Sequence, residues 1–361
     1  MAALNIRTSL RYVAIYYIIV LSGSLPSPHY LRMLLGYVIL LALIQSSINA
    51  VQHIMGDEFR DKYFGGPDIE LELSSIHTLI TDKLDKMGAA YGTFGKAAPA
   101  AFFMMIVIIY AAINAVRTNK ILESYKWWLI YISLLVGIFL TYKRAAFIIA
   151  LLVPLITAYI LKRTQFVVRY IIFSAAGASL FFIFGSLEQN EYVREKSTAI
   201  SPYESIHNLM TEEYWSIAFT KSRGWMLTEV SREVMASFKP LGYGADEMNA
   251  KAQLATLGGE FAKLLSFGAF DDVFIVACLV YYGPVGLILL LLAFYDLRLR
   301  AVRLYKHSDL EYKQIALMIM IAILILLPAA FVERILEFRA LSFLLWSLCG
   351  YVAVAERHRL R

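Results

Sequence analysis

The sequence predicts an all-α membrane protein, a polytopic transmembrane helical bundle with eight or nine spans and a large extracytoplasmic helical loop. Apolar residues make up 59% of the 361 residues and charged residues 17%, against about 25% charged residues in an average soluble domain. The charges also gather between long apolar runs, each close to the roughly 20 residues that a helix needs to cross a bilayer. A water-soluble fold would have too little polar surface, so we expect a single membrane domain over residues 1–361.

Eight apolar runs have the length expected of a membrane-spanning helix. They cover residues 31–50, 98–116, 127–142, 145–161, 166–187, 272–295, 314–332 and 338–355. A ninth, shorter run covers residues 10–25 and ends at Ser-Leu-Pro-Ser-Pro. A signal peptide fits this first run less well, because no clear small-residue cleavage site follows it.

The distribution of basic residues predicts the topology. Two hydrophilic segments, 51–97 and 188–271, are too long to be simple turns, whereas most other connections are short and basic. Lys and Arg collect in cytoplasmic loops, so both long segments are expected outside the cytoplasm. Within 203–238, apolar residues at mixed i+3 and i+4 spacing predict amphipathic helices. With a cytoplasmic C-terminus, nine spans would leave Arg7 and Arg11 outside, so either the first run does not cross fully or an upstream helix is missing.

Several classes of function have no support in the sequence. The chain contains no Walker A, HExxH or GxSxG motif and no DxD-type metal motif, and residues 242–244 form an isolated GxG. Cys278 and Cys349 lie in apolar runs without metal-ligand spacing, so neither a disulfide framework nor a zinc site is expected. The net charge of +6 is explained by cytoplasmic loops and does not indicate nucleic-acid binding. We therefore predict neither a cofactor nor a metal.

Charged residues at the predicted outer ends of spans are the main candidates for chemistry. Arg144 begins an apolar run, where it is either functional or an interfacial anchor. Arg223 lies in the large outer segment, where the alternative is a solvated loop residue. Asp271 and Asp272 directly precede a predicted span, where capping of a helix N-terminus is the simpler explanation. Each of these signals is weak when taken alone.

Four motifs follow one another along the chain, and their order is more informative than any one of them. They are residues 92–99 (GTFGKAAP), residues 140–146 (LTYKRAA), residues 222–225 (SRGW) with 240–244 (PLGYG), and residues 271–274 (DDVF) with 283–287 (GPVGL). Over about residues 31–355 this order resembles the O-antigen polymerase/O-antigen ligase family of bacterial membrane glycosyltransferases. Lys143 stands where the family has a serine before the arginine, and Asp271 stands where it commonly has a histidine.

The resemblance implies a metal-independent glycosyltransferase of the bacterial inner membrane, with its active site facing the periplasm. Its substrate would be an oligosaccharide linked to undecaprenyl diphosphate. Its other partners would be membrane lipid and other glycan-assembly proteins. Arg144 and Arg223 would bind the diphosphate, since guanidinium groups pair bidentately with phosphate and stay charged. Asp271 or Asp272 would accept the proton of the acceptor hydroxyl, if burial or the paired charge raises its pKa.

Four further residues are weaker candidates for the same site. Arg334 and Arg339 lie in the short outer turn between the last two spans, where an interhelical ion-pair cluster is the alternative. His207 is the histidine of the large outer segment and an alternative base, although a surface histidine is the default reading. Trp225 would stack on a sugar ring, or else anchor or pack its loop.

The sequence leaves two other functions open. A ligase would transfer finished glycan to a lipid A-core or another acceptor, but the missing histidine favours the polymerase. A transporter or flippase is the alternative of another class. The predicted helix interiors contain almost no acid or base for ion coupling and no visible half-repeats, which argues against transport.

Overall fold

In the computed structural model the described residues are entirely helical or irregular. They are 12–24, 27–64, 90–94, 96–118, 121–163, 166–168, 170–171, 211–212, 216, 226–237, 239–244, 250, 252–253, 256, 273–308, 310–331 and 333–360. Of these residues 85% are helical and none lies in a strand, which confirms the all-α prediction. Arg144, Arg334 and Arg339 are among them, whereas other predicted site residues lie outside the described residues. Those outside are His207, Arg223, Trp225, Asp271 and Asp272.

Five of the described helices are long and apolar enough to cross a membrane. They are α3 (Pro28–Phe64), α5 (Ala97–Arg117), α15 (Phe274–His307), α16 (Leu310–Ala329) and α17 (Arg339–Leu360). Three shorter apolar helices are α2 (Val13–Ser22), α6 (Ile121–Phe139) and α7 (Arg144–Ile160). These helices indicate a membrane protein. The count of eight or nine spans stays a prediction, since most of the expected run 166–187 lies outside the described residues.

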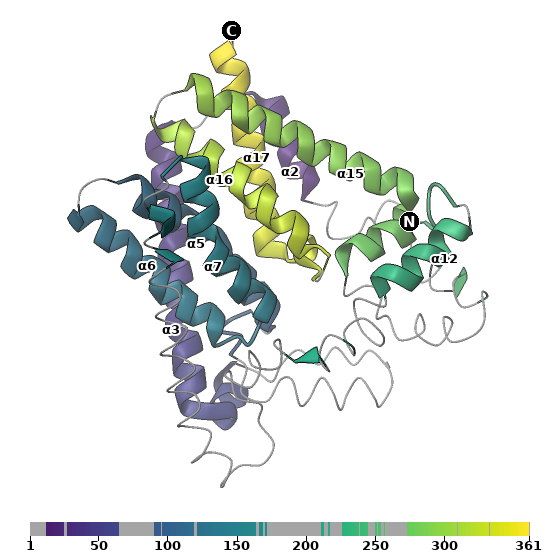
Figure 1. The fold of residues 1–361 in the computed structure, drawn as a ribbon, viewed down its shortest axis with the longest axis horizontal. Coiled ribbons are helices and arrows are strands. Elements are labelled where there is room, and N and C mark those ends of the chain that lie inside the picture. Colours follow the sequence, from purple (N-terminus) through teal and green to yellow (C-terminus); the bar gives the residue numbers. More distant parts are fainter. Residues whose placement is uncertain are drawn as a thin grey trace. The chain divides into compact units, whose positions relative to one another are not determined.

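The chain divides into two compact units. The first unit contains residues 1–35 and 212–361, and the second unit contains residues 36–211. Figure 1 shows α5, α6 and α7 of the second unit together, and α15, α16 and α17 of the first unit together.

The second unit is a bundle of helices that alternate in direction. Ring contacts join Tyr110 to Trp127 and Phe139 to Phe147, with centroid distances of 5.5 and 5.3 Å. Hydrogen bonds join Ser124 to Ala115 and Tyr131 to Ala150, so α6 runs antiparallel to both α5 and α7. The Ser46 hydroxyl of α3 donates to the Ser133 carbonyl of α6 at 2.7 Å. Further along both helices, Asn49 bonds to Gly137, which makes α3 parallel to α6. Consecutive membrane spans cross the bilayer in opposite directions, so the predicted spans require this alternation.

A proline inside α7 is compensated by a tyrosine of α6, and a second tyrosine bonds the next carbonyl. Pro154 has no N–H, so the Ala150 carbonyl loses its intrahelical donor. The Tyr131 hydroxyl of α6 donates to that carbonyl at 3.0 Å, and the Tyr170 hydroxyl donates to the Leu151 carbonyl at 2.9 Å. In an environment without water, such side-chain donors satisfy the backbone groups that a proline frees.

In the first unit, α2 and α15 both run parallel to α17. Phe294 of α15 stacks on Trp346 of α17, with centroids 5.7 Å apart. Tyr16 of α2 lies edge-on to the same tryptophan, and one end of α2 is held by a 3.0 Å hydrogen bond between His358 Nε2 and the Gly23 carbonyl. The 10 residues of α2 span about 15 Å, half of the roughly 30 Å hydrocarbon core. The described part of this helix is therefore too short to cross a bilayer alone.

The helix α3 extends beyond the predicted boundary at residue 50. It continues to Phe64, across a break at Gly56, where φ is 81° and ψ is −177°. A glycine adopts this conformation without the steric cost of a Cβ, so the chain can turn and continue as a polar helix. The segment predicted as a loop from residue 51 thus begins as helix.

Candidate functional site

Two of the four sequence motifs lie at the same end of the second unit. The Ala90 N–H donates to the Leu140 carbonyl at 2.9 Å, which joins the segment before α5 to the segment before α7. The first motif then leads through Lys96 into α5, and the second leads through Lys143 into α7 at Arg144. The N-termini of both helices are therefore preceded by basic residues at one end of this unit.

A row of buried polar side chains on α3 holds the first motif in place. Gln52 is 2% exposed, and its Oε1 accepts from the Tyr91 and Gly92 N–H groups at 3.1 and 2.8 Å. Its Nε2 donates to the Gly92 carbonyl at 3.0 Å. Two turns before Gln52, Gln45 Oε1 accepts from the backbone and hydroxyl of Thr93 at 3.2 and 3.0 Å. We call Gln45, Asn49 and Gln52 the amide row.

The amide row also connects this loop to α6. Gln45 Nε2 donates to Asn49 Oδ1 and to the Tyr91 carbonyl, both at 3.2 Å, and Asn49 Nδ2 donates to the Gly137 carbonyl at 3.0 Å. The loop that begins α5 is thus bonded to α3 through buried amides, and Asn49 of the same row bonds α3 to α6. Such a network fixes backbone geometry, because each bond broken would leave a buried polar atom unsatisfied.

The second motif forms a tight turn that fixes the start of α7. The Thr141 hydroxyl is buried and donates to the Ile138 carbonyl at 2.6 Å. Tyr142 has φ 56°, a left-handed conformation that is uncommon for a residue with a side chain. Its ring lies edge-on to His53 of α3, with centroids 6.3 Å apart. Arg144, the first residue of α7, is partly exposed.

Three basic residues and two helix N-termini gather at this end. We call Lys96, Lys143 and Arg144 the cationic rim. Each helix N-terminus carries about half a positive elementary charge from its unpaired N–H groups, and α5 and α7 both begin here without an acidic residue in the first turn. The arrangement has the charge and the donors that a phosphate group requires.

The described parts of the other two motifs, residues 240–244 and 283–287, are brought together in the first unit. The Tyr243 and Gly244 N–H groups donate to the Val280 and Tyr281 carbonyls at 2.8 and 3.1 Å, and the Val285 N–H donates to the Pro240 carbonyl at 3.1 Å. These three bonds resemble a short ladder between the turn 240–244 and a break in α15.

The break in α15 explains why the turn binds there. Gly283 has φ 65° and is followed by Pro284, which cannot donate a hydrogen bond to the Val280 carbonyl. Tyr243 supplies the missing donor. A Cβ on Gly242 would come within 2.5 Å of the Gly283 nitrogen, so the two glycines permit this close backbone approach. The same turn is packed by Tyr243, 5% exposed, against the buried start of α15.

The start of α15 lies beside the turn between α16 and α17. The Ile275 N–H donates to the Ala330 carbonyl at 3.2 Å, and Val273, which follows the predicted acidic pair, is fully buried. In the adjacent turn Glu333 is buried, Arg334 is partly exposed, and Arg339 is an exposed residue at the start of α17. The structure therefore brings the α15 start and these two predicted arginines to one end of the first unit.

Sequence reasoning missed the amide row and the ladder between the turn and α15. A signal for the amide row was present, because residues 45, 49 and 52 repeat at i, i+4 and i+7 and so share one helix face. No family model matches the chain, and the search of curated proteins found no match either.

Proposed function

We propose that the chain is a metal-independent membrane glycosyltransferase that lengthens oligosaccharides linked to a polyprenyl diphosphate, the reaction of O-antigen or exopolysaccharide polymerisation. The observation that carries the proposal is the cationic rim at the start of α5 and α7, held by buried hydrogen bonds and derived from two of the four motifs. The inner membrane, with the site facing the periplasm, is the proposed location.

The rim suits the leaving group of this reaction. As the bond between the sugar and the diphosphate breaks, negative charge grows on the leaving phosphate oxygens. Arg144 and Arg223 are the proposed diphosphate ligands, and Lys96 and Lys143 would add positive potential. Preorganised cations that face a developing charge are among the strongest contributions to catalysis.

The reaction needs one proton acceptor and no redox partner. The acceptor hydroxyl oxygen attacks the anomeric carbon of the donor sugar, and the bond from that carbon to the diphosphate oxygen breaks. The hydroxyl proton passes to Asp271 or Asp272, and the lipid diphosphate leaves as an anion. A carboxylate acts as this base if its surroundings raise its pKa towards neutrality.

The test compares Arg144→Ala with Arg163→Ala, a matched control near the opposite end of α7. Purified protein in detergent is given a polyprenyl-diphosphate-linked oligosaccharide, and product length is followed by electrophoresis. We expect Arg144→Ala to slow chain extension by roughly 10²-fold or more, as when one oxyanion donor is removed, and Arg163→Ala to leave it near the wild-type rate. Equal rates for Arg144→Ala and wild type would exclude the arginine from catalysis.

The same assay distinguishes the competing functions. Longer lipid-linked chains from the donor alone indicate a polymerase. Transfer that starts only after a separate lipid A-core acceptor is added indicates a ligase. Movement of lipid-linked oligosaccharide across a vesicle membrane with no change in its length would instead indicate a transporter or flippase.

A further inference from the structure

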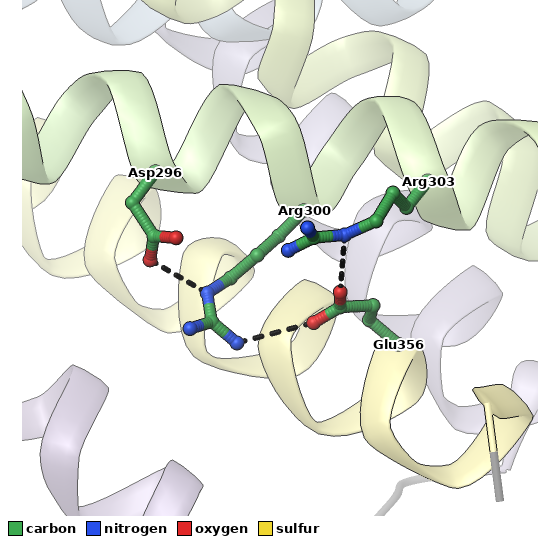
Figure 2. A network of polar contacts seen from close by, with 4 residues as sticks. All are labelled: Asp296, Arg300, Arg303 and Glu356. Carbon is green, nitrogen blue, oxygen red and sulfur yellow. Dashed lines mark hydrogen bonds and ion pairs between the residues drawn. The ribbon is translucent and has the colours of Figure 1, made fainter.

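A carboxylate at the other end of α15 joins two arginines. Glu356 of α17 is 4% exposed, and each of its oxygens accepts from a different guanidinium group, Arg303 Nε at 2.7 Å and Arg300 Nη1 at 3.1 Å. Arg300 Nε also pairs with Asp296 at 2.7 Å. Figure 2 shows both arginines reaching from one face of α15 towards Glu356. We call these four residues the Glu356 network.

The Glu356 network lies where α15 leaves the apolar part of the chain. Residues 340–355 of α17, directly before Glu356, contain no charged side chain and, at about 1.5 Å per residue, cover about 24 Å of the roughly 30 Å hydrocarbon core. Residues 284–295 of α15, which follow its break at Gly283, are also uncharged. The charges of α15 begin at Asp296 and continue to its end at His307. This part of the helix is therefore at the level of lipid headgroups.

Positive charge is in excess around the Glu356 network. Residues 296–308 and 356–358 contain five Lys and Arg residues against two acids, and both acids are already paired with Arg300 or Arg303. The Arg303 side chain stays 47% exposed and bonds to Glu356 through its Nε. Lys306 is exposed one turn further along, on the same side of the helix.

We propose that Arg303 and Lys306 bind the phosphate of an anionic phospholipid headgroup, with Glu356 as a positioning residue. Glu356 holds the Nε edge of Arg303, which leaves the terminal guanidinium nitrogens directed away from the carboxylate. A guanidinium group and a nearby ammonium can then donate to the same phosphate. The uncharged residues 284–295 and 340–355, which lead directly to the network, place the phosphate beside acyl chains, which favours a lipid over a phosphate ion from solution. This inference does not depend on the proposed glycosyl transfer.

The test measures binding of phosphatidylglycerol to the full chain in detergent by native mass spectrometry. We compare wild type with Lys306→Ala, which leaves the Glu356 network intact, and with the double variant Arg303→Ala/Lys306→Ala. The matched control is Arg298→Ala, an exposed arginine five residues before Arg303 and about 140° around the helix from it.

We expect the double variant to weaken phosphatidylglycerol binding about tenfold or more and Lys306→Ala to weaken it severalfold, from the contribution of each surface cation. Arg298→Ala should change it less than about twofold. Equal weakening by Arg298→Ala, or equal affinity of wild type for phosphatidylglycerol and phosphatidylcholine, would overturn the site. Displacement of the lipid by inorganic phosphate at equal concentration would overturn the choice of a lipid as the ligand.

Discussion

Replacing Gln52 with alanine tests whether the amide row holds the loop before α5. The Gln52 side chain accepts two backbone N–H groups and donates to one carbonyl, over 2.8 to 3.1 Å, and is 2% exposed. Gln52→Ala leaves two donors and one acceptor without these partners. A buried unsatisfied polar group costs about 1–3 kcal/mol.

The net loss of stability should be smaller than the sum of these costs. Folding orders the glutamine side chain at an entropic cost of up to about 2 kcal/mol, and alanine avoids this cost. The loop can also relax partly towards water. We therefore expect Gln52→Ala to lower the free energy of unfolding by about 2–4 kcal/mol. Reversible unfolding of the detergent-solubilised protein by SDS titration, followed by tryptophan fluorescence, measures this difference.

The matched control is Ser47→Ala on the same helix. Ser47 is exposed and its hydroxyl bonds to the Leu43 carbonyl of its own helix at 3.0 Å, so its removal should change stability by no more than about 0.5 kcal/mol. A Gln52→Ala protein as stable as Ser47→Ala would refute the reasoning. The loop would then be held by contacts other than the amide row.

Two further substitutions test the breaks in the helices. Gly283→Ala should lower the free energy of unfolding by more than about 2 kcal/mol, because its φ of 65° is strained for alanine and its Cβ would overlap the carbonyl of the docked turn. Gly36→Ala, where a Cβ would meet open space, should be neutral or slightly stabilising in the same SDS titration. Tyr131→Phe removes the donor to the carbonyl freed by the proline of α7 and should cost about 1 kcal/mol. The exposed Tyr125→Phe should cost nothing measurable, and equal effects of the two tyrosine variants would refute the bridging role.

Helix positions were predictable where the apolar run and the helix end together. The run 98–116 is helix α5, Ala97–Arg117, in the structure, and the run 145–161 is α7, Arg144–Ile160. The run 31–50 is shorter than α3, which continues to Phe64. The length of an apolar run predicts the part of a helix that lies in lipid. It does not predict how many helical turns follow in water.

The candidate site was predictable as a set of motifs and not as a set of contacts. Arg144 at the start of a helix follows directly from the end of an apolar run. The bond between Ala90 and Leu140 joins residues 50 positions apart, and no spacing rule in the sequence predicts it. The ladder at Gly283 is similar, because Pro284 signals a missing donor but does not identify Tyr243 as the residue that replaces it.

The loop at the start of α5, Pro154 in α7 and Gly283 in α15 illustrate the same physical requirement. At each one, backbone groups that have no helical partner are satisfied by a group from elsewhere in the chain. Water would supply these bonds in a soluble protein, but it is scarce inside a membrane bundle. The hydrogen-bond partner must therefore come from the protein, and its bond fixes the backbone at each of these three sites. The cationic rim begins at one such turn, so its backbone geometry is set by buried hydrogen bonds and needs no bound ligand to form.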